Sequence, residues 1–151
     1  MEANEKTVVT GVCNYCGQLV TLGQIEALRE QEVANPDYWA TRTCTCYEAK
    51  EFDRAETQKE LDRKRRDSAI QEALKLIEDK LGPAAAQAWQ GRAFPELDVQ
   101  VRALFRSASG MVYDGIIDAV QASAADGSVV KMYMDGKTGR IELRRKQSLE
   151  I

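Results

Sequence analysis

The feature that most constrains the fold is a stretch from Tyr47 to Leu81 that contains neither glycine nor proline. It is rich in Glu, Lys, Arg, Gln, Ala and Leu, which have high helix propensity, so it predicts one long helix. Gly82 and Pro83 follow directly and are expected to end it. The chain of 151 residues therefore divides into three parts, residues 1–46, 47–81 and 82–151.

The two halves of this predicted helix differ in character. Most residues from Glu48 to Asp67 are charged, and the pairs Glu60–Lys64 and Asp62–Arg66 have the favourable acid-before-base spacing of a helix. We expect this half to be a solvated arm. In the second half, apolar residues repeat at intervals of three and four and indicate a buried stripe. They are Ile70, Ala73, Leu74, Ile77 and Leu81.

The N-terminal part contains four cysteines in two pairs, Cys13 with Cys16 and Cys44 with Cys46. The first pair lies between two short predicted strands, residues 7–10 and 18–20, in a turn that directs both sulfurs inward. Gly17, directly after this turn, is free to take a positive φ angle. The second pair has one intervening residue, which suits an extended strand because residues two apart face the same side.

Between the two pairs, residues 24–33 predict a short helix that Asn35, Pro36 and Asp37 would end. Tyr38 and Trp39 follow, and we expect them to shield a metal site.

Two cysteine pairs separated in sequence are what a tetrahedral thiolate site requires. The chain starts with polar residues and has no long apolar run, so we expect it to stay in the cytoplasm, where thiols bind metals rather than form disulfides. We therefore predict one zinc ion bound by Cys13, Cys16, Cys44 and Cys46. Four thiolates leave no position for water, so this zinc would be structural. An iron-sulfur cluster, a redox dithiol and four unligated thiols remain alternatives.

The C-terminal part predicts a helix followed by a sheet. An amphipathic helix is expected over residues 96–113, with one apolar face. This face comprises Val101, Leu104, Phe105, Ala108, Met111 and Val112. Beyond residue 115, apolar residues alternate in three segments separated by glycine-containing turns, which indicates a three-stranded meander.

These elements together predict an α+β protein. It would consist of an N-terminal four-cysteine zinc knuckle, a long charged helix, and a second amphipathic helix packed on a C-terminal three-stranded antiparallel β-meander.

Catalysis finds little support in the sequence. The chain has no histidine, which excludes Ser-His and Cys-His arrangements and most metal-dependent hydrolytic sites. No glycine-rich phosphate-binding loop is present, and residues 136–139 suit a hairpin turn. We therefore expect no enzyme activity, although a carboxylate-based nuclease remains conceivable.

Contact with nucleic acid would have to be local, because the formal net charge is −3. The basic cluster at residues 63–66 lies among acidic residues and suggests a self-neutralised helix surface. A second cluster, near the C-terminus, is a better candidate. It comprises Arg140, Arg144, Arg145 and Lys146. Edge strands also carry Lys and Arg to prevent sheets from pairing, which explains the second cluster equally well.

Three segments resemble a group of small uncharacterised zinc-binding proteins of bacteriophages and prophages that carry an N-terminal CxxCGQ…CxC motif. They are Cys13–Gln18, Cys44–Lys50 and, more loosely, Val101–Lys146. The resemblance implies an accessory protein of a mobile element that acts on a host machine or inhibits host defence. It supplies no catalytic residues.

We therefore expect a non-enzymatic, zinc-stabilised interaction protein in the cytoplasm of a bacterial host, without membrane contact. Its long helix and meander would bind a macromolecular partner, and a host or phage protein is favoured over nucleic acid. The alternative is a zinc-dependent DNA- or RNA-binding regulatory protein that uses the basic cluster near the C-terminus.

Overall fold

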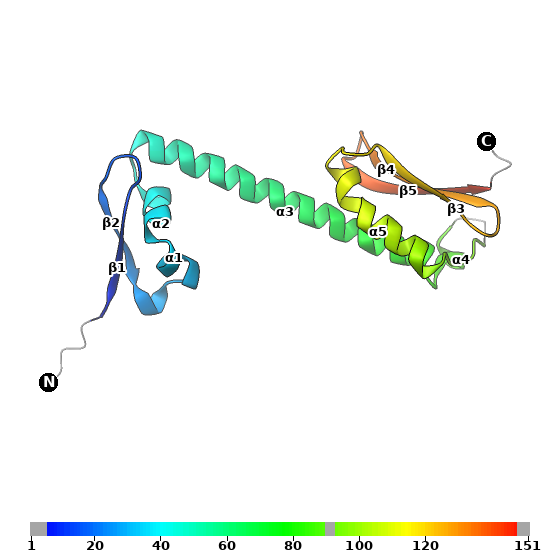
Figure 1. The fold of residues 1–151 in the computed structure, drawn as a ribbon, viewed down its shortest axis with the longest axis horizontal. Coiled ribbons are helices and arrows are strands. Elements are labelled where there is room, and N and C mark those ends of the chain that lie inside the picture. Colours follow the sequence, from blue (N-terminus) through cyan, green and yellow to red (C-terminus); the bar gives the residue numbers. More distant parts are fainter. Residues whose placement is uncertain (1–5, 90–92, 148–151) are drawn as a thin grey trace. The chain divides into compact units, whose positions relative to one another are not determined.

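The computed structural model describes residues 6–89 and 93–147 and confirms the α+β class. The chain forms two compact units, residues 1–62 (unit 1) and residues 63–151 (unit 2). The predicted long helix is present as α3, Tyr47–Leu81, and ends directly before Gly82 (Figure 1). The boundaries of the predicted three-part division lie at the two ends of α3, whereas the boundary between the two compact units lies within this helix.

Unit 1 begins with an antiparallel hairpin of β1, Val8–Val12, and β2, Leu19–Gln24. A single 3-10 turn, Ile25–Ala27, and two short helices follow. The helices are α1, Glu30–Ala34, and α2, Pro36–Thr43. After α2, a short loop leads into α3.

The predicted helix over residues 24–33 is wrong in its first part, whereas its end before Asn35 is confirmed by α1. Gln24 still belongs to β2, and the N–H of Ile25 donates to the carbonyl of Thr7 at 3.0 Å, so pairing with the N-terminal strand extends into the predicted helix. Arg29 is also extended, with φ −72° and ψ 152°, and only the short α1 follows it. Strand pairing at the start of this segment outweighs its high helix propensity.

Helix α2 was not predicted, because Pro36 was expected to end a helix. In the structure Pro36 starts one, in the first turn, where the missing N–H costs nothing. The eight residues of α2 include Asp37 and Thr41, which bond to the backbone on either side of Cys13.

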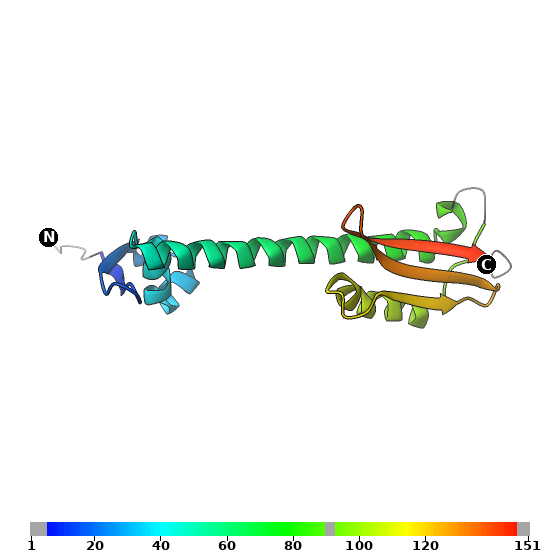
Figure 2. The same ribbon diagram turned by 90° about the horizontal axis from the view of Figure 1, so that it is seen from above.

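Unit 2 contains the later part of α3, the short α4, Ala85–Ala88, and α5, Val99–Tyr113. Asp98 caps α5 by accepting the N–H of Gln100 at 2.8 Å. Three antiparallel strands follow in the order β3-β4-β5, which confirms the predicted meander (Figure 2). They are β3, Ala119–Ser123, β4, Ser128–Asp135, and β5, Arg140–Gln147.

The core of unit 2 lies between the helices and one face of the sheet. Helix α3 contributes Ala73, Ile77 and Leu81, and α5 contributes Phe105, Ala108 and Val112. The sheet contributes Val130, Met132, Ile141 and Leu143. No helix of unit 2 that the structure describes covers the opposite face of the sheet, which we call the open face (Figures 1 and 2).

Two residues expected on the apolar face of α5 are exposed. Leu104 retains 54% of its accessible surface and Met111 retains 41%. The helix packs through the stripe that contains Phe105, Ala108 and Val112, and the exposed pair lies beside that stripe. The predicted face was therefore too wide.

Buried charge joins α3 to α5. Arg102, 7% exposed, donates to Glu78 on α3 at 2.9 Å, to Glu96 at 3.0 Å and to the carbonyl of Leu97 at 3.2 Å. Arg106 also bonds to Glu78. These partners compensate for the burial of a guanidinium group.

The charged half of α3 uses its side chains differently from the prediction. Arg66 binds both carboxylate oxygens of Asp114 at 2.8 and 2.9 Å, within unit 2. Glu60 accepts a bond from Arg42 at 2.6 Å, within unit 1. Arg66 and Glu60 thus bond to other elements, while the pairs Glu51–Arg54 and Glu56–Lys59 form along the helix itself. None of the helices in the described ranges has the length and apolar character needed to cross a membrane.

Candidate metal centre

The four cysteines meet at one point in unit 1. Their sulfur atoms all lie within 4.8 Å of one another. The Cys13 and Cys46 sulfurs are 3.9 Å apart, and those of Cys16 and Cys44 are 3.5 Å apart. A tetrahedral ion with metal–sulfur bonds of about 2.3 Å would separate its sulfur ligands by about 3.8 Å. The cluster therefore has the size of a site for a single metal ion.

The first pair sits on a tight turn at the end of β1. The N–H of Gly17 donates to the carbonyl of Cys13 at 2.9 Å, and the N–H of Cys13 donates to Gln18 at 3.0 Å. Gly17 has a φ angle of +72°, a conformation that favours glycine. The predicted knuckle is confirmed in its turn and in its glycine.

The second pair lies in the loop between α2 and α3, not on the predicted strand. Cys44 caps α2, and its N–H donates to the carbonyl of Ala40 at 2.9 Å. Cys46 accepts the N–H of Lys50 at 3.0 Å and so joins the first turn of α3. The sulfurs converge because the chain turns sharply from one helix into the next.

Nearby backbone N–H groups and thiols shift the pKa values of Cys13 and Cys16 in opposite directions. The N–H of Cys16 lowers the pKa of the Cys13 thiol to about 6, and the N–H of Tyr15 adds to this effect against the cost of burial. The N–H of Gln18 lowers the pKa of Cys16, but the nearby Cys44 thiol, burial and the other two thiols outweigh it and raise that pKa to about 12. Four thiolates this close repel one another, and a bound cation would offset that repulsion.

The surroundings of the sulfurs are apolar on one side only. Cys13, Cys44 and Ala49 form a small buried cluster, with Val20 and Cys46 packed against it. Cys16 is exposed. The cluster is the only compact group of metal-ligating side chains found in the described part of the chain.

Helix α2 holds the first cysteine pair in place. The carboxylate of Asp37 accepts the N–H of Val12 at 2.9 Å, and the hydroxyl of Thr41 accepts the N–H of Asn14 at 3.0 Å. Thr41 is fully buried and donates in turn to the carbonyl of Asp37 at 2.8 Å. The residues on both sides of Cys13 are thus bonded to α2.

Gly11 allows β1 to approach α2. A Cβ atom at this position would lie 2.1 Å from the carbonyl oxygen of Pro36 and 2.9 Å from the Cβ of Ala40. Replacing Gly11 by alanine is therefore expected to push the strand from the helix and to destabilise unit 1 by about 1–3 kcal/mol. Thermal unfolding of the metal-loaded protein measures this as a lower midpoint.

The matched control is Gly136→Ala in unit 2, where an added Cβ meets no atom within 4 Å. It should unfold like the wild type. A Gly11→Ala variant with an unchanged midpoint would contradict the close approach of β1 to α2.

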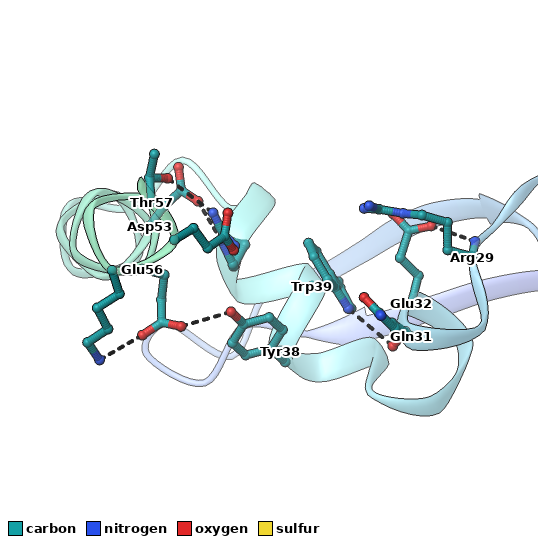
Figure 3. Close-up of polar contacts among 11 residues, drawn as sticks. Arg29, Gln31, Glu32, Tyr38, Trp39, Asp53, Glu56 and Thr57 are labelled. Atoms are coloured by element: carbon teal, nitrogen blue, oxygen red, sulfur yellow. Dashed lines mark hydrogen bonds and ion pairs between the residues drawn. The ribbon is translucent and has the colours of Figure 1, made fainter. Parts of the chain in front are cut away.

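Tyr38 and Trp39 connect helices rather than cover the sulfurs. The Tyr38 hydroxyl donates to Glu56 on α3 at 2.9 Å (Figure 3). The Tyr38 ring meets the Phe52 ring edge-on, with 5.9 Å between the ring centres. The Trp39 indole donates to the carbonyl of Gln31 at 3.1 Å, away from α3. The apolar groups packed against the buried cysteines come from Val20 and Ala49 instead.

Arg42 is the strongest link between α2 and α3. Its side chain is 11% exposed and donates to Asp53 at 2.7 Å and to Glu60 at 2.6 Å. A third bond joins it to Thr57 at 3.1 Å. Arg42 thereby fixes the two helices on either side of the loop that carries Cys44 and Cys46.

The basic residues predicted near the C-terminus do not share one surface. Arg140, Arg144 and Lys146 are exposed, whereas Arg145 points into unit 2 and is 5% exposed. Arg145 donates to the hydroxyl of Ser128 at 3.0 Å and to the carbonyl of Pro95 at 2.7 Å. Arg145 thereby joins β5 to β4 and to the segment before α5. Neighbouring residues of a strand face opposite sides, so the alternation with Ile141 and Leu143 could have revealed this.

Comparison of the chain with family models, with curated proteins and with solved structures gave no match. The resemblance to phage and prophage proteins, in which only the cysteine motifs are specific, stays a prediction. Fold and site together define an α+β protein with a four-cysteine candidate metal centre.

Proposed function

We propose that this chain is a non-enzymatic interaction protein in which one structural zinc ion stabilises unit 1. The observation that carries the proposal is the closed group of four sulfurs within 4.8 Å of one another. Zinc prefers tetrahedral coordination by sulfur and nitrogen, and four cysteines are a common structural set. Because unit 1 has a small buried core of its own, the metal would supply much of its stability.

The distances favour a single ion over the alternatives. A disulfide needs about 2.05 Å between sulfurs, and the closest pair among these four is 3.5 Å apart. An iron-sulfur cluster separates its cysteine ligands by the width of the cluster, because different irons bind them. Sulfurs this close leave room for one ion only.

A binding role follows from the way the ligand positions are filled. Four thiolates complete a tetrahedron and leave no position for a reacting water molecule. The chain has no histidine to act as a general base or metal ligand. The proposed zinc ion therefore shapes a surface, and the activity of the protein is the binding of a macromolecular partner. The motif resemblance supports an accessory role in a phage or other mobile element.

Elemental analysis tests this proposal directly. Protein purified without added metal is expected to contain about one zinc ion per chain. A sample that contains an equal amount of iron and absorbs visible light would contradict zinc. A sample that is free of metal yet fully ordered would remove the metal from the proposal altogether.

A further inference from the structure

We propose that the open face of the β3-β4-β5 sheet binds single-stranded nucleic acid. Lys131, Arg144 and Lys146 would contact phosphates, and Tyr133 would contact a base. This inference rests on the proposed function, because it names the partner of the interaction protein. The sequence favoured a protein partner, and the charges placed on this face are the reason to prefer nucleic acid.

The three cations come from two adjacent strands. Lys131 on β4 lies directly opposite Arg144 on β5, and Val129 lies opposite Lys146. All three basic side chains are exposed, on the face opposite the core residues Val130 and Leu143. Lys131 was not among the residues singled out from the sequence, because only strand pairing places it beside Arg144.

Protection of a sheet edge does not account for this arrangement. Strand β5 is at the edge of the sheet, where Lys and Arg commonly prevent pairing with another chain. Strand β4 is central, and both of its edges are already paired. Lys131 therefore has no edge to protect.

The position of Lys131 is also unfavourable in the protein alone. Like charges directly opposite each other on adjacent strands destabilise a sheet. Among the residues that the structure describes, Lys131, Arg144 and Lys146 form no ion pair. An anionic ligand would relieve the repulsion between these cations, and this is the charge complementarity on which the proposal depends.

A shallow groove of about 270 Å³ lies among these cations. Its walls contain basic and amide side chains and one valine, without an acidic residue. They are Gln121, Val129, Lys131, Arg144, Lys146 and Gln147. Amide groups can bond to base edges or sugars, so the lining suits a nucleotide better than an apolar ligand.

Tyr133 places an aromatic ring beside the charged groups. The guanidinium of Arg144 lies 5.4 Å from the ring centre and donates to the Tyr133 hydroxyl at 3.3 Å. The ammonium of Lys131 lies 5.8 Å from the same ring. Aromatic rings and guanidinium planes on an open sheet stack against unpaired bases, whereas bases in a duplex are already stacked.

Two other occupants fit less well. A second copy of the same face would bring Lys and Arg against Lys and Arg. Duplex DNA is usually bound by a strongly basic domain, whereas the formal net charge of this chain is −3. The patch suits a few phosphates of one strand.

Fluorescence anisotropy of the full-length, zinc-loaded protein with labelled oligo(dT) and oligo(U) tests the inference. Three phosphate contacts with a single strand predict affinity about twentyfold weaker at about 200 mM salt than at about 50 mM. The combined variant Lys131→Gln, Arg144→Gln, Lys146→Gln should bind at least about tenfold more weakly and lose most of this salt dependence.

The matched control removes the same charge from α3. Arg54, Lys59 and Lys64 are exposed, so the variant Arg54→Gln, Lys59→Gln, Lys64→Gln should bind like the wild type. Tyr133→Leu should weaken oligonucleotide binding about tenfold, and Tyr133→Phe should retain most of it. Circular dichroism confirms that each variant is folded.

Several results would overturn the inference: no binding at low salt, equal loss in the sheet and α3 variants, or tighter binding to duplex DNA. Poly-glutamate that binds as tightly as oligo(dT) would indicate an acidic protein partner instead. Zinc content is measured on the same samples. A zinc-loaded protein that does not bind refutes only this inference, whereas metal-free, ordered protein refutes the proposed metal centre.

Discussion

Replacing Cys44 by serine is expected to release the proposed zinc ion and to unfold unit 1 while unit 2 stays folded. Cys44 is 6% exposed, caps α2 and leads directly into the loop before α3. Structural zinc contributes roughly 10–16 kcal/mol in small domains at neutral pH, which exceeds what the small buried cluster of unit 1 can replace. Three thiolates and a water molecule would hold the ion much less firmly.

Two-dimensional amide NMR separates the two units in this experiment. Signals from β1, β2 and α2 should lose their dispersion, and signals from β3, β4 and β5 should persist. Strong chelation of the wild type should reproduce the result. Thr45→Ser, an exposed position between the two cysteines, is the matched control and should keep both metal and dispersion. Dispersed signals from the β1-β2 hairpin in the metal-free variant would contradict the proposal that the ion stabilises unit 1.

The second large effect is expected from Phe105→Ala in unit 2. Phe105 is fully buried on α5 and lies in the core shared with α3 and the sheet. Truncating a buried phenylalanine leaves a cavity and costs about 3–5 kcal/mol. Since domains of this size have modest total stability, this variant should be close to unfolding.

Urea unfolding followed by tryptophan fluorescence measures the change. The chain has two tryptophans, one in each unit, so a Trp39→Phe background leaves Trp89 as the reporter of unit 2. The neighbouring Leu104→Ala is the control, because Leu104 is 54% exposed and its loss should change the free energy of unfolding by about 0.5 kcal/mol or less. Equal effects of the two substitutions would show that α5 does not pack as described.

The elements that the sequence predicted well are those with a strong local pattern. Helix α3 has a long stretch of good helix formers and a Gly-Pro stop, and β3, β4 and β5 alternate between glycine-containing turns. Residues 24–43 were predicted poorly, because contacts distant in sequence decide their conformation. The bond between Ile25 and Thr7 extends the hairpin, and the bonds of Asp37 and Thr41 to the knuckle favour α2.

The four ligand residues of the candidate site were predictable from the sequence, but the contacts that position them were not. Cysteine spacing was enough to group the four sulfurs, since few other arrangements use two such pairs. The path between Cys44 and Cys46 was not predictable, because it depends on Arg42 joining α2 to α3. On the sheet, Arg145 was grouped with Arg144 because they are adjacent in sequence. In the structure they face opposite sides of β5, and Lys131 on β4 lies beside Arg144 instead.

The burial of Arg145 also restricts how β5 can align with β4. A slip of one residue would turn Arg144 and Lys146 into the core and expose Ile141 and Leu143. It would also take Arg145 away from Ser128 and Pro95, its hydrogen-bond acceptors. The misaligned strand would therefore bury Arg144 and Lys146, whereas the observed strand buries only Arg145, which has hydrogen-bond acceptors. An alignment that keeps Ile141 and Leu143 in the core therefore directs Lys131 and Arg144 to the same side of the sheet.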